Sequence, residues 1–206
     1  DQTLLVSTPA AIFRSTDGGD GWEQVLLRPE TAGSVRLLGF APEGPAYAWF
    51  DYDNTLYRSR DGGRRWQAAP TEGPDSAEPV AMAGGLIAPD GTLLLRPSFY
   101  PQLLRVDPQG PSRQPLTDVL PAGFGEIQTL TYTPDGTLLA GGSRGLLRSL
   151  DGGLTWQVAR NAGPLDQADI SHLHATETDL FVGLRAGQLF RFEGEAASWQ
   201  EISVVR

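Results

Sequence analysis

Histidine side chains are the first candidates for chemistry, because an imidazole can bind a metal ion or transfer a proton near neutral pH. The chain has only two, His172 and His174, separated by one residue. In a β-strand this spacing directs both side chains to the same face. The pair is a candidate metal or anion site, but two imidazoles alone hold zinc weakly. Solvated histidines are the simpler interpretation, and we predict neither a metal ion nor a cofactor.

The second set of candidates is a group of carboxylates in a string that occurs three times, Ser-x-Asp-Gly-Gly-x-x-Trp. Its aspartates are Asp17, Asp61 and Asp151, and its tryptophans are Trp22, Trp66 and Trp156. An Asp side chain can accept hydrogen bonds from backbone N–H groups ahead of it, and the glycines allow positive φ. Three equivalent carboxylates spread along a repeat cannot converge on one substrate. We therefore predict that they form turns, with the tryptophans packed beside them.

The rest of the sequence offers no motif of a common catalytic class. It contains no Gly-x-Ser-x-Gly, no phosphate-binding loop and no His-Glu-x-x-His. It has no cysteine, which excludes disulfides and thiolate metal sites. A net charge of −9 disfavours nucleic acid as a partner. No apolar run is long enough to predict a membrane span. We predict that the chain is not an enzyme.

The three strings belong to a longer repeat. Each is preceded by two apolar residues and an arginine, and this lead-in occurs five times. The arginines are Arg14, Arg58, Arg105, Arg148 and Arg191, separated by 44, 47, 43 and 43 residues. After Arg105 and Arg191 the string itself has decayed, although Trp199 keeps the last tryptophan position. Five copies of the lead-in at this nearly constant spacing indicate a repeat fold.

Each repeat is typical of four short antiparallel strands. Apolar runs alternate with turns such as Thr133-Pro134-Asp135-Gly136, in which Pro presets φ and Asp and Gly tolerate the tight positions. A four-stranded sheet cannot cover both of its own faces, so neighbouring sheets must stack, and radial stacking gives a β-propeller. We predict an all-β fold, a β-propeller of about five four-stranded blades. The single domain spans residues 1–206, with repeats at about 1–33, 34–78, 79–124, 125–167 and 168–206.

The first repeat is incomplete. It begins at Thr3-Leu4-Leu5-Val6, which matches a second strand, so this chain lacks the inner strand of the first blade. A closed five-bladed ring is the arrangement that we prefer, and a longer parent ring is the alternative. An open fragment would leave two blade faces uncovered and prone to aggregation.

The repeated string resembles the Asp-box, or BNR repeat, of a family that includes sialidases, sortilin-type receptors and photosystem II assembly-factor-like propellers. The resemblance covers nearly the whole chain and implies that each box forms the turn between the third and fourth strands of a blade. Sialidase chemistry would need three convergent arginines, a Tyr–Glu pair and a separate acid. The arginines of this chain recur with the repeat, so they lie on separate blades. We expect them to pair with carboxylates of neighbouring blades.

A ligand site is expected where the first strands of the blades line the central tunnel. The aligned strands cover residues 35–40, 82–87, 127–132 and 170–175. By strict alternation, one face is predicted to form the core between blades, with Leu38, Phe40, Leu130, Tyr132 and Leu173. The other face is predicted to line the tunnel, with Leu37, Gly39, Gly84, Leu86, Thr129, Thr131, His172 and His174. Thr129 and Thr131 are then expected to face the two histidines across the channel.

A protein partner is the preferred ligand class. Phe99 and Tyr100 lie in a Pro-bounded loop and are candidate interface anchors. We predict a non-enzymatic, extracytoplasmic scaffold or assembly factor, in the periplasm, secreted or tethered to a membrane, whose leader or anchor is not present in this chain. Its partner is expected in a membrane-associated complex. The alternative is a carbohydrate-binding propeller or a sialidase-like glycoside hydrolase.

Overall fold

The computed structural model describes residues 3–27, 34–41, 44–51, 55–69, 82–98, 103–107, 113–116, 119–159, 163–193 and 198–203. Over these ranges the chain is all-β apart from one 3-10 turn, η1 (Gly163–Leu165). None of its described helical residues forms a segment long and apolar enough to cross a membrane. The chain divides into two compact units, Asp1–Pro115 and Leu116–Arg206, which we describe separately.

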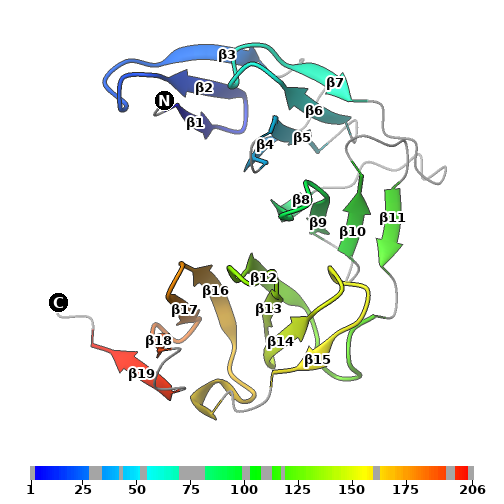
Figure 1. Ribbon diagram of the computed structural model, residues 1–206, viewed down its shortest axis with the longest axis vertical. Helices are drawn as coiled ribbons and strands as arrows, with labels where there is room; N and C mark the ends of the chain where they lie inside the picture. The colour runs from blue at the N-terminus through cyan, green and yellow to red at the C-terminus, as the bar shows by residue number, and fades with distance from the viewer. Residues whose placement is uncertain are drawn as a thin grey trace. The chain divides into compact units, whose positions relative to one another are not determined.

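The N-terminal unit begins with a three-stranded antiparallel sheet (Figure 1). Its strands are β1 (Leu4–Ser7), β2 (Ala11–Ser15) and β3 (Glu23–Leu27). The first Asp-Gly-Gly string lies between β2 and β3, whereas the other two copies lie between the third and fourth strands of the second and fourth sheets. β1 is therefore a second strand, and the described part of the first sheet lacks an inner strand, as predicted.

Two four-stranded sheets complete the N-terminal unit. The second sheet contains β4 (Val35–Phe40), β5 (Ala46–Phe50), β6 (Thr55–Ser59) and β7 (Gln67–Ala69). The third sheet contains β8 (Met82–Ile87), β9 (Leu93–Pro97), β10 (Leu103–Val106) and β11 (Arg113–Leu116). In both sheets the strands lie in chain order, so each is a simple antiparallel meander.

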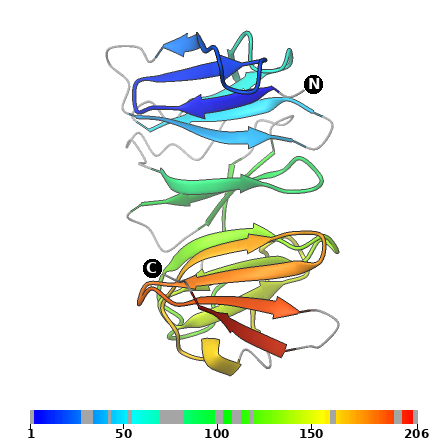
Figure 2. The ribbon, with the colours of Figure 1, turned by 90° about the vertical axis from the view of Figure 1, so that its left-hand side faces the viewer.

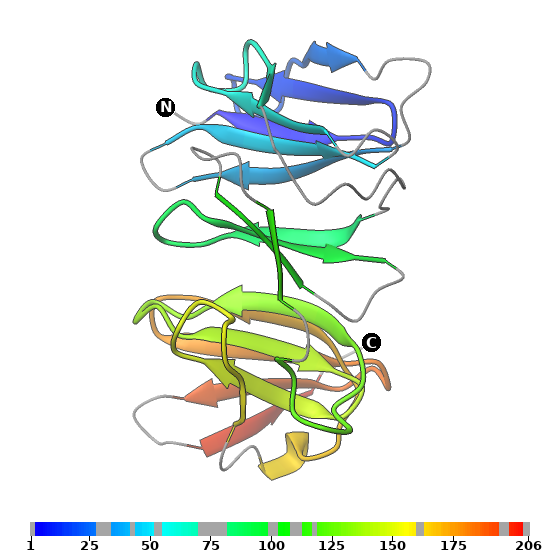
Figure 3. The same cartoon turned by 90° about the vertical axis from the view of Figure 1, so that its right-hand side faces the viewer.

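The C-terminal unit holds two more four-stranded meanders. The fourth sheet contains β12 (Ile127–Tyr132), β13 (Leu138–Gly142), β14 (Gly145–Ser149) and β15 (Gln157–Val158), the yellow-green strands of Figure 3. The fifth sheet contains β16 (Ile170–Ala175), β17 (Asp179–Leu184), β18 (Leu189–Glu193) and β19 (Ser198–Ile202), which run side by side from orange to red in Figure 2.

The core of each unit lies between its sheets. In the N-terminal unit, one cluster joins Ile12 of the first sheet to Val35 and Phe50 of the second. Another joins Trp49 of the second sheet to Met82 of the third. In the C-terminal unit, side chains of the fourth and fifth sheets form a single cluster that includes Leu139, Leu146, Ile170, Leu180 and Val182. Stacking therefore buries the faces that one sheet cannot cover alone.

The predicted division of the inner strands into a core face and a tunnel face is wrong for two residues. Leu37 packs into the cluster between the first and second sheets, while its neighbour Leu38 packs into the cluster between the second and third. Each face of β4 thus packs against a neighbouring sheet through a partly buried leucine. Phe40, predicted in the core, is exposed. Each of the four inner strands also contains a register shift, so strict alternation does not hold along it.

Candidate functional site

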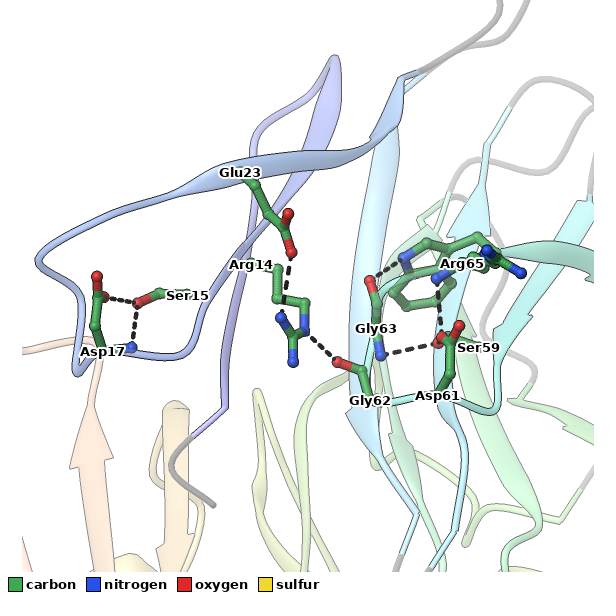
Figure 4. Close-up of polar contacts among 10 residues, drawn as sticks. Arg14, Ser15, Asp17, Glu23, Ser59, Asp61, Gly62, Gly63 and Arg65 are labelled. Carbon is green, nitrogen blue, oxygen red and sulfur yellow. Dashed lines mark hydrogen bonds and ion pairs between the residues drawn. The ribbon is translucent and has the colours of Figure 1, made fainter.

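The first box is a turn closed by its own side chains. Ser15 Oγ donates to Asp17 Oδ1 at 2.6 Å (Figure 4). It also accepts the N–H of Gly19 at 2.9 Å. Asp17 Oδ1 also accepts the N–H of Gly21 at 3.0 Å, and Trp22 Nε1 donates to the Gly19 carbonyl at 2.9 Å. Gly18 and Gly19 have φ of 80° and 103°, a conformation that glycine adopts without strain.

The same bonds recur in the other two boxes. Asp61 Oδ1 accepts the N–H of Arg65 at 2.8 Å, and Asp151 Oδ1 accepts the N–H of Thr155 at 2.8 Å. Asp151 Oδ2 additionally accepts the Thr155 hydroxyl at 2.6 Å. In all three boxes, therefore, the carboxylate is used within its own turn.

The electrostatics of the boxes agree with this geometry. The hydrogen bond from Ser15 and then that from the Gly21 N–H lower the pKa of Asp17. The backbone N–H of Arg65 lowers the pKa of Asp61. Desolvation alone would raise the pKa of Asp151, but its bonds from Thr155 and Ser149 lower it overall. These groups are held as carboxylates, which suits a turn and not a proton donor.

The box tryptophans differ in how far they are covered. Trp156 is only 7% exposed, Trp66 is half-buried and Trp22 is 43% exposed. Each still donates its Nε1 hydrogen to the carbonyl of the second box glycine. The turn is therefore the same in each box, and the difference lies in what covers it.

The structure does not bring the two histidines and the two threonines together. Thr129 Oγ1 accepts the N–H of Leu173 at 3.2 Å, so this hydroxyl is directed at the fifth sheet. His172 and His174 are exposed and pair with Gly183 and Phe181 across β16 and β17. They lie on the opposite face of the fifth sheet from the cluster that packs against the fourth. Thr131 is half-buried on β12.

A cavity of about 330 Å³ lies on that opposite face of the fifth sheet. Its lining includes His172, His174, Phe181, Gly183 and Leu189. His172 Nδ1 lies 3.0 Å from the hydroxyl of Ser171. No group of three metal-ligating side chains occurs among the residues that the structure describes. This face is therefore a mixed apolar and imidazole surface.

A second cavity, of about 310 Å³, lies in the N-terminal unit beside the inner strand β4. Hydroxyl residues Ser7, Thr8 and Ser34 line it, together with Arg36 and the backbone around Gly84. Arg36 Nε lies 3.8 Å from Asp51 Oδ2, while Asp51 Oδ1 accepts the N–H of Met82 at 3.0 Å.

Asp51 thus bonds to the third sheet and forms a long ion pair with the exposed Arg36. The sequence does not single out Arg36, because it belongs to no motif. The one available signal is a charged residue at the second position of an otherwise apolar inner strand. A guanidinium among hydroxyl groups can bind a carboxylate or peptide carbonyls.

Three of the recurrent arginines, Arg14, Arg105 and Arg191, pair with carboxylates of their own sheets and not, as expected, with those of neighbouring blades. Arg14 Nη1 binds Glu23 of its own sheet at 3.2 Å, and its Nε donates to the Gly62 carbonyl of the second sheet at 2.7 Å (Figure 4). Arg191 Nε binds Asp179 of its own sheet at 2.8 Å. The cross-sheet partner of Arg14 is thus a backbone carbonyl, because the box turn presents one at that position.

A polar network connects the two sheets of the C-terminal unit. Arg185 Nε binds Asp169 Oδ2 at 3.0 Å, and its Nη2 binds Gln128 Oε1 at 2.6 Å. Gln128 Nε2 in turn donates to Asp169 Oδ1 at 2.6 Å. These donors and acceptors bond to one another, so the network links the fourth sheet to the fifth.

The fold and the sheet topology define the class: the chain is an all-β protein of the β-propeller class. No family model matches it. A solved structure of YCF48 bound to a D1 peptide matches 95% of this chain and 62% of its own length, with a TM-score of 0.69 and 22% identity. A streptogramin B lyase matches 100% of this chain and 70% of its own, with a TM-score of 0.68 and 13% identity. At such identities the likeness concerns the fold alone.

A curated relative is the photosystem II assembly lipoprotein Ycf48 of Nostoc sp., which is 27% identical over 199 residues. The alignment covers 96% of this chain and 56% of that protein, so the chain spans little more than half the relative's length. The relative is named for assembly and not for a reaction, in agreement with the predicted non-enzymatic class. Phe99 and Tyr100, the predicted interface anchors, lie outside the described residues.

Proposed function

We propose that this chain is a non-enzymatic, protein-binding propeller that acts as an assembly or stability factor for a membrane-associated complex. The observation that carries the proposal is the 27% identity to the photosystem II assembly lipoprotein Ycf48 along 96% of the chain. All five repeats share in that similarity. We further propose that residues 1–206 form one propeller domain, and that it works outside the cytoplasm, because the relative is a lipoprotein.

The cavity beside β4 is the proposed peptide site. The ion pair with Asp51 uses Arg36 Nε, so the Nη donors are the part of the guanidinium that a ligand would meet. The Ser7 hydroxyl accepts the N–H of Leu37, and the Thr8 hydroxyl is bonded within its own turn. The O–H of Ser7 and the hydroxyl of Ser34 are therefore the groups that can bond to a peptide. The site thus suits an extended segment with a carboxylate. Phe99 and Tyr100 remain proposed contacts of the same partner, and His172 with His174 a proposed second binding face.

The proposal is tested by immobilising the chain and passing detergent-solubilised photosynthetic membranes over it. Retention of photosystem II proteins, D1 among them, is the expected result. A variant with Arg36→Ala should retain less, and one with Arg64→Ala as much as the unaltered chain, since Arg64 is an exposed arginine of the same unit that does not line the cavity.

The competing carbohydrate function is tested on the same preparation. Glycan-array binding or sialidase activity, with no retention of photosystem proteins, would replace the proposed function. Two aromatic positions recur within the described sheets. One is the box tryptophan, which is bonded within its own turn, and the other precedes the repeated arginine as Phe13, Tyr57 and Phe190.

A further inference from the structure

Exposed apolar side chains of the C-terminal unit gather in one short segment. Among the residues that the structure describes there, the exposed large hydrophobic ones are Leu150, Leu154 and Val158, at 72%, 42% and 60% exposure. They lie in the box of the fourth sheet and in the outer strand β15 that follows it. Apolar residues that are exposed singly are ordinary on a protein surface, whereas a group of them marks an interaction site.

The two leucines belong to a single bonded turn. Asp151 accepts the N–H of Thr155 at 2.8 Å and the Thr155 hydroxyl at 2.6 Å. Leu150 precedes Asp151 and Leu154 precedes Thr155, so these bonds bring both leucines to the same turn. We call Leu150 and Leu154 the leucine turn.

Leucine is not what the box itself requires at these positions. All three intact boxes form the same bond from the backbone to the box aspartate. In the other two boxes the residues equivalent to Leu150 and Leu154 are polar: Thr16, Asp20, Arg60 and Arg64. The exposed leucines are therefore specific to the fourth sheet, and the formation of the turn does not explain them.

The second sheet shows that these positions face solvent even within a stack of sheets. It packs on the first sheet through one cluster and on the third sheet through another, all within the N-terminal unit. Arg60 and Arg64 of its box are nevertheless exposed, as is Ala68, the equivalent of Val158. A neighbouring sheet on either side therefore leaves these positions of the box open.

Two carboxylates accompany the leucines. Asp151 lies in the turn itself. By the register of β13 and β14, Thr137 lies beside Leu150, and the N–H of Thr137 donates to Asp135 Oδ1 at 3.1 Å. Neither aspartate takes part in an ion pair within the described part of the chain. The surface around the leucine turn is thus both apolar and negatively charged.

We propose that the leucine turn binds a segment of a partner protein that carries both apolar and basic side chains. The leucines provide the apolar contact, and Asp135 and Asp151 attract the basic groups. The inference does not depend on the proposed function, because the leucine turn and the cavity beside β4 belong to different units.

Two other occupants fit this surface less well. An anionic membrane would be repelled by both carboxylates and by the net charge of −9. A second copy of the chain would bring the same carboxylates with it. The few apolar side chains here also cover only a small part of the about 800 Å² per partner that a stable interface buries. A short basic segment meets neither objection.

The test is fluorescence anisotropy with a labelled amphipathic peptide of leucine and lysine, compared with a leucine–glutamate peptide of the same length and pattern. The chain should bind the lysine peptide saturably and the glutamate peptide not at all. The double variant Leu150→Thr, Leu154→Asp carries the residues of the first box, so its turn should form, and it should bind about tenfold more weakly or less. Because Leu154→Asp adds a negative charge, weaker binding would identify the apolar contact.

Two matched controls accompany the double variant. Leu27→Thr removes an exposed leucine of the N-terminal unit and should bind as the unaltered chain does. Asp135→Asn should weaken binding roughly two- to fivefold. Asp166→Asn, the same change at an exposed residue beside η1, should leave binding unchanged. Circular dichroism should show that all variants are folded.

Failure of the unaltered chain to bind the lysine peptide, or equal binding by the double variant, would overturn the proposal. Equal effects of Asp135→Asn and Asp166→Asn would contradict the attraction of basic groups by this surface. Sedimentation with phosphatidylglycerol vesicles that the double variant abolishes would make the surface a lipid site instead. A molar mass that rises with concentration only when both leucines are present would make it a contact between copies.

Discussion

Arg14 of the first sheet donates a hydrogen bond of 2.7 Å from Nε to the carbonyl oxygen of Gly62 in the second sheet. The bond joins the two recurring features of the sequence, the arginine of one repeat and the Asp-Gly-Gly turn of the next. Because Leu5 rests on Gly63 beside it, the box serves two purposes at once. It closes its own hairpin, and it provides the surface on which the preceding sheet packs.

Arg14→Ala should destabilise the chain by roughly 1.5–3 kcal/mol, the range for a hydrogen bond to a charged group in a buried setting. Arg105→Ala, at the same repeat position, should cost less than about 1 kcal/mol, because that side chain is 30% exposed and its ion pair with Asp90 is 3.8 Å long. Urea unfolding measures both. Equal losses would contradict the role given to the Arg14–Gly62 bond.

Gly63→Ala should lower the melting temperature more than Gly136→Ala. Both glycines have positive φ, 84° and 83°, so both variants carry the same backbone strain. At Gly63 the added methyl also meets Leu5, whereas at Gly136 it meets nothing within 4 Å. The difference between the variants therefore measures the packing of the first sheet on the second box. If Leu5→Ala fails to reduce that difference, the packing argument is wrong.

Asp151→Ala should lower the melting temperature by a few degrees, since roughly 2–4 °C corresponds to 1 kcal/mol in a chain of this size. The loss follows from the N–H and hydroxyl of Thr155, which would lose their acceptor. Asp166→Ala is the control, because Asp166 is an exposed residue beside η1. Differential scanning calorimetry gives both melting temperatures. An equal decrease for Asp166→Ala would contradict the role of the Asp151 carboxylate in stabilising its turn.

The stability of the chain should fall steeply on acidification. Asp135 has its pKa lowered by the hydroxyl of Thr133 and then by the N–H of Thr137, from an ordinary value of 3.8. A carboxylate with a lowered folded-state pKa stabilises the fold fully above 3.8, and this contribution is lost as the pH falls through the folded-state pKa. The box aspartates shift in the same direction.

The melting temperature of the Asp135→Asn variant should therefore fall less between pH 5 and pH 3 than that of the unaltered chain. The measurement is a thermal melt at each pH. Parallel curves for the two proteins would show that the turn carboxylate makes no pH-dependent contribution.

Much of the fold follows from the sequence because turn chemistry and apolar spacing agree within each repeat. The inner strands Val35–Phe40, Met82–Ile87, Ile127–Tyr132 and Ile170–Ala175 have the ends that the pattern predicts. Turns that rely on an Asp acceptor and on Gly at positive φ can be predicted from the sequence, and these turns determine where the strands end.

The faces of the inner strands were harder to predict, for a physical reason. A register shift between Ile170 and His172 lets Ile170 and Leu173 pack in the same cluster although they are three residues apart. Strict alternation cannot anticipate such a bulge, because it inserts one residue without a sequence signature. Strict alternation also predicts that His172 faces Thr129. In the structure Thr129 Oγ1 instead accepts the N–H of Leu173, and His172 lines the cavity on the other face of the fifth sheet from the shared cluster.

The proposed binding of a protein segment in the cavity beside β4 is measured by isothermal titration calorimetry with a D1 peptide, the ligand of the similar YCF48 structure. We predict saturable binding that Arg36→Ala weakens at least tenfold, or about 1.4 kcal/mol, and that Arg64→Ala leaves unchanged. If the unaltered chain gives no measurable heat, or if the two variants bind equally well, the cavity is not a peptide site.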